Sequence, residues 1–150
     1  MRFENKVVLI TGAGAGIGAA AAFRFGKEGA AVACNSVTDS AEMVAGQLKE
    51  QGMDSLFVKG DISLEQDTVR VVQTVLDRYG RIDVLVNNAG IVLGGTIDDT
   101  RLEDFRRNLD VNVIGTFLMS QQVVKVMKKQ GKGVIAVTAP LLAAYASRFR

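Results

Sequence analysis

Short apolar runs alternate with longer segments of helical character along the chain. The apolar runs lie at residues 6–10, 31–34, 56–58, 82–86 and 134–137. Apart from Lys6 and Asp83, they are apolar at consecutive positions, which is typical of strands that are buried on both faces of a sheet. The segments between them are rich in alanine or carry apolar residues at helical spacing, and each ends near a glycine. The chain is therefore predicted to alternate between strands and helices throughout.

This alternation predicts an α/β fold in which about five parallel strands form a doubly wound sheet. We expect the strand order 3-2-1-4-5 and three layers, because helices that connect parallel strands cover both faces of the sheet. No linker, repeat or low-complexity tract divides the sequence. Residues 1–150 are therefore expected to form a single domain.

Capping pairs mark the expected starts of three helices. In such a pair, an acceptor side chain is followed three positions later by Glu or Gln. The pairs are Asp39 with Glu42, Ser63 with Gln66, and Thr100 with Glu103. The apolar face of the first helix contains Met43, Val44 and Leu48, and the buried stripe of the second contains Val69, Val71, Val72, Val75 and Leu76. The third and longest helix runs through Phe105, Leu109, Val113, Phe117 and Val124 toward Gly131.

The net charge is close to zero, which excludes some classes of partner. The chain has 18 Lys and Arg against 16 Asp and Glu, a net charge of +2, so we expect neither nucleic acid nor an anionic membrane as a partner. One basic cluster contains Lys125, Lys128, Lys129 and Lys132. These cations are expected to complement the carbonyl groups at a helix end, and a binding patch is the alternative.

Histidine is absent and cysteine occurs once, as Cys34. These counts exclude Ser-His and Cys-His nucleophiles, histidine zinc sites and internal disulfides, and we expect no metal. Cys34 is expected to pack as a small apolar residue in a reducing compartment. The apolar stretches are shorter than a membrane span, and we expect a cytoplasmic protein.

The first strand ends in a glycine-rich turn that leads directly into a helix. Gly12, Gly16 and Gly18 have the spacing Gly-x-x-x-Gly-x-Gly. A strand, a glycine turn and a helix point main-chain N–H groups and the positive helix end at one place, where the diphosphate of a dinucleotide can bind. The common dinucleotide spacing would need glycine at Ile17, and no Gly-Lys-Ser/Thr follows as in a P-loop. A purely structural turn is the alternative.

Four motifs lie in register along the predicted fold. They are Thr11-Gly12-Ala13-Gly14-Ala15-Gly16-Ile17-Gly18, Gly60-Asp61-Ile62, Asn87-Asn88-Ala89-Gly90 and Asp110-Val111-Asn112-Val113. Together they resemble the short-chain dehydrogenase/reductase family. The resemblance extends from about residue 6 to residue 137, and it implies a Rossmann-like domain that binds NAD or NADP. The implied cofactor-binding residues are Gly12, Gly14, Ala15, Gly16, Ile17, Gly18, Ser36, Asp61, Ile62, Asn88, Ala89 and Gly90.

The resemblance also implies particular roles. Asp61 would accept a hydrogen bond from adenine, which is compatible with capping the next helix. Asn88, Ala89 and Gly90 would line the ribose and the nicotinamide, and Asn87 would tie neighbouring loops together. Asn112 matches the active-site asparagine, which interrupts its helix and orders a water in a proton relay. The cost of burying an unpaired amide disfavours a simple packing role for it.

Residue 36, at the end of the second strand, bears on the choice of cofactor. An acidic residue there binds the ribose diol of NAD, and a basic residue binds the extra phosphate of NADP. Ser36 is neither, and no Arg or Lys is close to it in sequence; position 15, too, is alanine. Because no acid repels the phosphate, we expect NADP, with NAD as the alternative.

The residues after the fifth strand depart from the family pattern. The family has a serine there and then Tyr-x-x-x-Lys, in which the lysine lowers the pKa of the tyrosine so that it serves as acid or base. Here Pro140 aligns with the serine and Phe149 with the lysine. Tyr145 comes several residues early but is the candidate for the tyrosine, with Asn112 as the other catalytic residue; packing is the alternative for Tyr145. Thr138 and Ser147 are the nearby hydroxyls.

Two functions are compatible with these observations. The first is an NAD(P)-dependent oxidoreductase that transfers hydride between the nicotinamide and a small alcohol or carbonyl substrate. The second is a catalytically inactive, truncated NAD(P)-binding domain, because family members continue into further strands and this domain is expected to be incomplete after about residue 138. The fifth strand would then be an open edge, which predicts self-association or a homo-oligomer.

Overall fold

Each predicted apolar run contributes a strand to one sheet. The structure is a computed structural model, and it describes residues 1–138. The strands are β1 (Val7–Thr11), β2 (Ala31–Ser36), β3 (Ser55–Lys59), β4 (Val84–Asn87) and β5 (Val134–Val137). All neighbouring pairs are parallel, and the order is β3-β2-β1-β4-β5. The predicted strand order is therefore confirmed.

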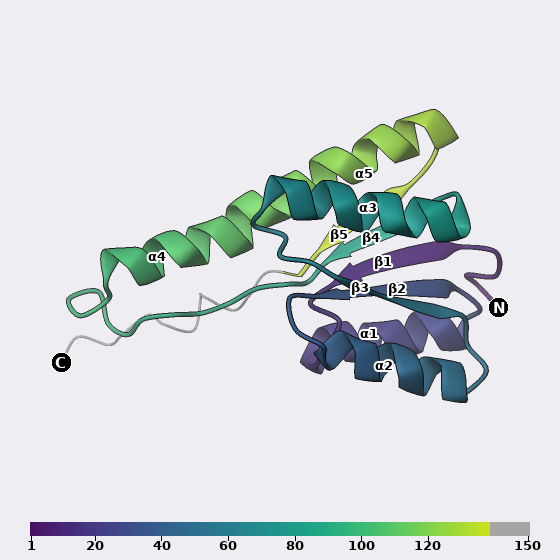
Figure 1. The fold of residues 1–150 in the computed structure, drawn as a ribbon, viewed down its shortest axis with the longest axis horizontal. Helices are drawn as coiled ribbons and strands as arrows, with labels where there is room; N and C mark the ends of the chain where they lie inside the picture. The colour runs from purple at the N-terminus through teal and green to yellow at the C-terminus, as the bar shows by residue number, and fades with distance from the viewer. Residues whose placement is uncertain (139–150) are drawn as a thin grey trace.

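Helices cover both faces of the sheet and complete three layers. They are α1 (Gly16–Lys27), α2 (Ser40–Glu50), α3 (Glu65–Tyr79), α4 (Leu102–Leu109), the π-helical segment η1 (Asp110–Gly115) and α5 (Thr116–Gln130). Figure 1 shows α1 and α2 on one face and α3 and α5 on the other, with α4 extending beyond the sheet. The arrangement is the doubly wound α/β fold that the alternation predicts. No helix within residues 1–138 combines the length and the apolar character needed to cross a membrane.

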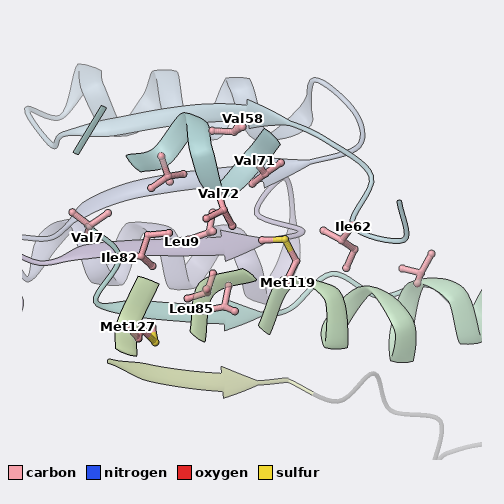
Figure 2. Close-up of a cluster of buried hydrophobic side chains, with 14 residues drawn as sticks. Val7, Leu9, Val58, Ile62, Val71, Val72, Ile82, Leu85, Met119 and Met127 are labelled. Carbon is pink, nitrogen blue, oxygen red and sulfur yellow. The ribbon is translucent and has the colours of Figure 1, made fainter. Parts of the chain in front are cut away.

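The core has two halves because successive residues of a strand point to opposite faces. Val7 and Leu9 of β1 belong to the cluster under α3 and α5, which Figure 2 shows. Val8 and Ile10 belong to the cluster under α1 and α2. Cys34 lies in this second cluster, as predicted, and burial raises the pKa of its thiol to about 12. The thiol therefore stays protonated near neutral pH and packs as an apolar group.

The longest predicted helix is present but is not a uniform α-helix. The π-helical segment η1 separates α4 from α5 around Asn112. α5 buries Met119, Val123 and Met127 against the sheet, whereas α4 buries no residue. The predicted body residues Phe105, Leu109, Val113 and Phe117 are all exposed. The apolar spacing of this helix therefore predicts its existence correctly, but most of these residues do not enter the core.

The predicted capping pairs are wrong, because their side chains bind elsewhere. Asp39 precedes α2 but caps nothing with its side chain, and it forms an ion pair with Lys59 at 2.7 Å. The hydroxyl of Ser63 donates to Asp61 at 2.6 Å, and α3 begins only at Glu65. Thr100 donates to the carbonyl of Thr96 at 2.7 Å. Val69 and Met43, which were expected on apolar faces, are exposed.

The lysine cluster lies where a helix end was predicted. Lys128 and Lys129 occupy the last turn of α5, which Gly131 ends in a left-handed conformation. Positive charge at this end complements the free carbonyl groups of the helix. The structure thus favours the helix-end interpretation over a binding patch.

The buried carboxylate of Asp83 joins the amino ends of β1 and β4. It accepts hydrogen bonds from the main-chain N–H of Val7 at 3.0 Å and from the guanidinium of Arg81 at 2.6 and 2.8 Å, and Lys6 lies 3.9 Å away. Burial alone would raise the pKa of Asp83, but these partners outweigh it and lower the pKa. The carboxylate is therefore an internal anchor of the sheet.

Replacing Asp83 by alanine is expected to lower the free energy of unfolding by about 2–4 kcal/mol at neutral pH, because Val7 and Arg81 lose a charged acceptor. A carboxyl whose pKa is lowered by folding stabilises above its unfolded pKa, and that contribution disappears as the pH falls through the folded value. The difference between wild type and Asp83→Ala should therefore shrink below about pH 4. Urea unfolding followed by circular dichroism at several pH values measures this. Glu50→Ala, at an exposed carboxylate, is the control and should show little change.

Candidate functional site

The carboxyl ends of the strands meet at one edge of the sheet, where two adjoining cavities open. One is lined by Gly12, Asn35, Ser36, Val37, Gly60, Asp61, Ile62, Ala89, Gly90, Ile91, Arg107 and Val111. The other is lined by Gly12, Gly14, Ala15, Gly16, Ser36, Ser40, Asn88, Ala89 and Gly90. Ten of the twelve residues predicted to bind a cofactor line one or both cavities, which share four lining residues. Such an edge is the usual ligand position in a doubly wound sheet.

The glycine turn packs directly against the loop that follows β4. A Cβ atom on Gly12 would lie 2.7 Å from the Cα of Ala89, so a side chain there would push the two loops apart. Gly18 is buried in α1, and a Cβ on it would collide with the carbonyl of Gly12 and the amide of Asn88. Gly18 therefore allows the glycine turn and Asn88 to pack closely against α1, and it lines neither cavity. Ile17, the other predicted residue outside the cavities, is 70% exposed.

Thr11 and Asn88 hold these two loops together. The hydroxyl of Thr11 accepts hydrogen bonds from the N–H groups of Asn88 and Ala89, both at 3.0 Å. The side-chain amide of Asn88 donates to the carbonyls of Thr11 and Gly12, both at 3.1 Å. Asn88 thus makes the connection between loops that was predicted for Asn87. The amide of Asn87 instead donates to Ser120 of α5 at 2.9 Å.

The start of α1 faces the second cavity without a side-chain cap. Ala15 precedes the helix in an extended conformation and has no side chain that could accept from the first N–H groups. A Cβ atom on Gly16 would meet no atom within 4 Å, so open space lies beside the helix end. Uncapped N–H groups and the positive end of the helix favour an anion at this place.

Asp61 lies in the first cavity and is held by two residues. Its Oδ1 accepts from the N–H and hydroxyl of Ser63 at 2.9 and 2.6 Å, and its Oδ2 accepts from the guanidinium of Arg107 at 2.8 Å. Burial would raise the pKa of Asp61, but Ser63 and Arg107 outweigh it and hold the pKa below its usual value. The carboxylate is therefore charged at neutral pH. It accepts from Ser63, two residues later in the same loop, and does not cap α3.

Three hydroxyls cluster at the end of β2. The hydroxyl oxygen of Ser36 lies 3.4 Å from the hydroxyl oxygens of both Thr38 and Ser40, and the latter two oxygens are 2.8 Å apart. Ser36 lines both cavities, and Ser40 packs against Gly14 of the glycine turn. Lys59 of β3 is in register with Ser36 and pairs with Asp39. The end of β2 thus presents neutral hydroxyl donors with a cation on the neighbouring strand.

Asn112 lies in η1 and is bound to the loop after β4. Its Oδ1 accepts from the N–H of Ile91 at 2.9 Å, and its Nδ2 donates to the carbonyl of Ile91 at 2.8 Å. The carbonyl of Asn112 accepts from the hydroxyl of Thr116 at 2.9 Å. The oxygen and the nitrogen of the side-chain amide therefore each have a main-chain partner, and Asn112 adjoins the first cavity through Ile91.

The predicted catalytic residue Tyr145 lies outside the described residues, as do Pro140, Ser147 and Phe149. Thr138 lies within them, and its hydroxyl donates to the Oδ1 of Asn88 at 3.0 Å. Over residues 1–138, no group of three or more His, Cys, Asp or Glu is placed to hold a metal ion.

The sequence motifs predict no role for three residues that hold the site together. Thr11 orients the loop after β4, Arg107 binds Asp61 across 46 residues of sequence, and Asn108 binds the main chain of Leu93. Arg107 and Asn108 lie on α4, which buries no residue, and just outside the fourth motif. Thr11 directly precedes Gly12 in the first motif, and its place at the end of a buried strand could have indicated a hydrogen-bonding role.

Comparison with known proteins identifies the class to which this fold and site belong. The family model described as short chain dehydrogenase matches residues 6–148. The chain therefore belongs to the short-chain dehydrogenase family.

Individual relatives agree with this assignment. An "Uncharacterized oxidoreductase" of Thermotoga maritima is 46% identical over 136 residues, which are 90% of this chain and 53% of the relative. A 3-beta-hydroxysteroid dehydrogenase of Comamonas testosteroni is 39% identical over 135 residues, 89% of this chain and 52% of the relative. The chain spans about half the length of the curated relatives it matches.

Two solved structures share the fold closely. NAD+-bound xylitol dehydrogenase has a TM-score of 0.91 at 33% identity, covering 97% of this chain and 57% of the other. A short chain dehydrogenase from Burkholderia cenocepacia J2315 in complex with NADP has a TM-score of 0.87 at 31% identity, covering 97% and 60%. Each of these two structures was determined with a nicotinamide cofactor bound.

Proposed function

We propose that this chain forms the cofactor-binding part of an NAD(P)-dependent oxidoreductase that transfers hydride between the nicotinamide and an alcohol or carbonyl substrate. The observation that carries the proposal is the pair of adjoining cavities at the carboxyl edge of the sheet. They place an uncapped helix start, a charged carboxylate and a wall of small residues along one continuous path. Relatives named as xylitol and 3-beta-hydroxysteroid dehydrogenases support an alcohol as substrate.

The residues present fit a dinucleotide. Main-chain N–H groups of Ala15 and Gly16 would bind the diphosphate, because the space beside Gly16 is open, whereas Ser40 fills the space beside Gly14. Asp61 would accept a hydrogen bond from the adenine amino group, and Ala89 and Gly90 would let the ribose and the nicotinamide approach the main chain. Such a cofactor accepts or donates hydride when bound. Asn112 would help to hold the proton-relay side of the site, and Tyr145 would be the acid or base.

Binding and turnover together test this function. Saturable binding of NADPH or NADH, followed by nicotinamide fluorescence, is expected, and oxidation of the reduced cofactor by a panel of small ketones should depend on Tyr145. The Tyr145→Phe variant should retain binding and lose turnover. Binding without turnover by the wild type would support the inactive cofactor-binding domain instead. No binding of either dinucleotide by folded protein would overturn the proposal.

We further propose that the site prefers NADP, on the basis of the hydroxyl cluster at the end of β2. Ser36, Thr38 and Ser40 can donate hydrogen bonds to a phosphate, and Lys59 lies on the adjacent strand in register with Ser36. A carboxylate at position 36 would repel that phosphate and accept from the ribose hydroxyls of NAD.

Replacing Ser36 by Asp is therefore expected to lower the ratio of NADPH affinity to NADH affinity by about 10- to 100-fold, which corresponds to roughly 1.4–2.8 kcal/mol. Fluorescence titration with each cofactor measures the ratio. Ser36→Asn is the matched control, because asparagine has the size of aspartate without its charge, and it should change the ratio much less. An unchanged ratio in Ser36→Asp would remove residue 36 from the choice of cofactor.

A further inference from the structure

Two asparagines of the α4–η1 helix bind the loop after β4 in the same way. Asn112 makes two hydrogen bonds with the main chain of Ile91, and Asn108 makes two with the main chain of Leu93. The N–H of Leu93 donates to Asn108 Oδ1 at 2.9 Å, and Asn108 Nδ2 donates to the carbonyl of Leu93 at 2.8 Å. We call this set of four hydrogen bonds the asparagine ladder.

The spacing of the ladder follows from the geometry of the two elements. Residues four apart in a helix are separated by about 6 Å along its axis, and residues two apart in an extended chain by about 6.6 Å. Asn108 and Asn112 can therefore each pair with one of two alternate residues of an extended segment. Each side-chain amide uses one N–H donor and its carbonyl acceptor here, as a residue of a neighbouring strand would. The helix thus replaces a strand as the partner of residues 91–93.

The loop depends on this ladder because its other hydrogen bonds are local. Between β4 and α4, residues 91–95 form no helix or strand. The remaining bonds of the tip join Gly95, Thr96, Asp99 and Thr100 to one another. Val92 and Leu93 are exposed and contribute no core packing. Among the described residues, the ladder therefore supplies the long-range hydrogen bonds of residues 91–93, and Ile91 is the residue of this segment that also packs against the core.

The same loop forms one wall of the proposed cofactor site. Ala89, Gly90 and Ile91 line the first cavity, and Ala89 contacts the glycine turn. A shift of residues 91–93 would move this wall, whereas Asp61 and the start of α1 belong to other loops. Only the part of a ligand that lies against the wall should respond to the loss of one pair of the ladder.

We propose that Asn108 is a positioning residue that acts through Leu93 to fix the nicotinamide side of the cofactor site. The inference rests on the proposed function. Asn108 need not touch the cofactor, and its contribution is to keep the loop after β4 in place together with Asn112.

The test compares each dinucleotide with a fragment that lacks nicotinamide: NADPH with 2′-phospho-ADP-ribose, and NADH with ADP-ribose. In Asn108→Ala, the affinity for the dinucleotide is expected to fall about 3- to 10-fold relative to the fragment, because about one net hydrogen bond of loop ordering is lost. Hydrogen exchange at Leu93, followed by mass spectrometry of peptides that cover residues 91–95, should become about tenfold faster.

Two further variants make the test specific. Arg106→Ala changes the exposed neighbour of Asn108 on the same helix, and it should alter neither the exchange nor the affinity ratio. Asn108→Asp keeps an acceptor for the N–H of Leu93 but loses the donor, and it should give an intermediate exchange rate.

The outcomes separate this inference from the proposed function. If wild type binds neither dinucleotide, the proposed function fails. If wild type binds but exchange at Leu93 is unchanged in Asn108→Ala, the ladder is not formed in solution. Faster exchange with an unchanged ratio of dinucleotide to fragment affinity would overturn the positioning role.

Discussion

Replacing Gly16 by alanine should weaken the binding of NADPH and NADH by about 100-fold or more, a loss of roughly 2.8 kcal/mol. Gly16 has φ of +54° and begins α1 beside the second cavity. The added methyl group would occupy the open space in front of the N–H groups and prevent a diphosphate from approaching them. Fluorescence titration or calorimetry measures the affinity.

The control for this change must separate backbone strain from obstruction. Gly80 also has a left-handed conformation, with φ of +71°, and a Cβ on it would meet no atom within 4 Å. It ends α3, far from the carboxyl edge of the sheet. Both Gly16→Ala and Gly80→Ala should lower the free energy of unfolding by about 1–2 kcal/mol, but Gly80→Ala should leave cofactor affinity unchanged. If Gly16→Ala and Gly80→Ala had the same cofactor affinity, the diphosphate would not bind at the start of α1.

Replacing Arg107 by methionine should weaken cofactor binding by about 10- to 100-fold at neutral pH, because Asp61 loses a charge-assisted hydrogen bond that sets its orientation. Arg107 also helps to hold the pKa of Asp61 below its usual value, so the pKa should rise in the variant. The charged carboxylate is the stronger acceptor for adenine. As the pH is lowered, affinity should therefore begin to fall at a higher pH in Arg107→Met than in wild type.

Calorimetric titrations of NADP+ between about pH 3 and pH 8, a range that extends below the usual carboxyl pKa of about 4, would measure this shift in the pH dependence of affinity. Arg107→Lys keeps the positive charge but not the planar pair of donors that reaches both Asp61 and Ser63, and it should restore only part of the affinity. Arg106→Met is the control on the neighbouring exposed position. A variant with wild-type affinity at every pH would exclude Asp61 from cofactor binding or Arg107 from its support.

The sheet could be predicted from the sequence because its signals are local and repeated. Val7 to Ile10 are apolar at every position, and both faces of β1 are in fact buried. Gly12 lies directly after that strand, so the position of the turn follows from the chain alone. The order of the strands follows from the family resemblance and from the preference for right-handed connections.

The ends of the helices were less predictable, since a capping side chain has several possible partners. Asp39 could cap α2, but Lys59 lies within reach in the folded chain and binds it. Ser63 is similarly engaged by Asp61 and Arg107. Lys59 is 20 residues away from Asp39 in sequence and Arg107 is 44 residues away from Ser63, so no short pattern indicates these partners.

The residues that hold the site residues in place were also not predictable, because their partners are distant in sequence. The resemblance indicated Asp61 and Asn112, and it did so through motifs that surround them. Arg107 and Asn108 have no such motif, and their importance appears only once the helix is placed against two loops. Sequence therefore indicates the residues that face a ligand better than those that hold them.

The π-helical segment η1 determines which way α4 faces. An α-helix turns by about 100° per residue, and a wide π turn accommodates one additional residue within the same helix. Side chains of α4 consequently point about 100° away from the directions that an unbroken helix continuing from α5 would give them. Because of this angular offset, the two ends of one continuous helix contact different parts of the domain. Met119 and Met127 of α5 lie against the sheet, while Arg107 and Asn108 of α4 reach the loops at its edge.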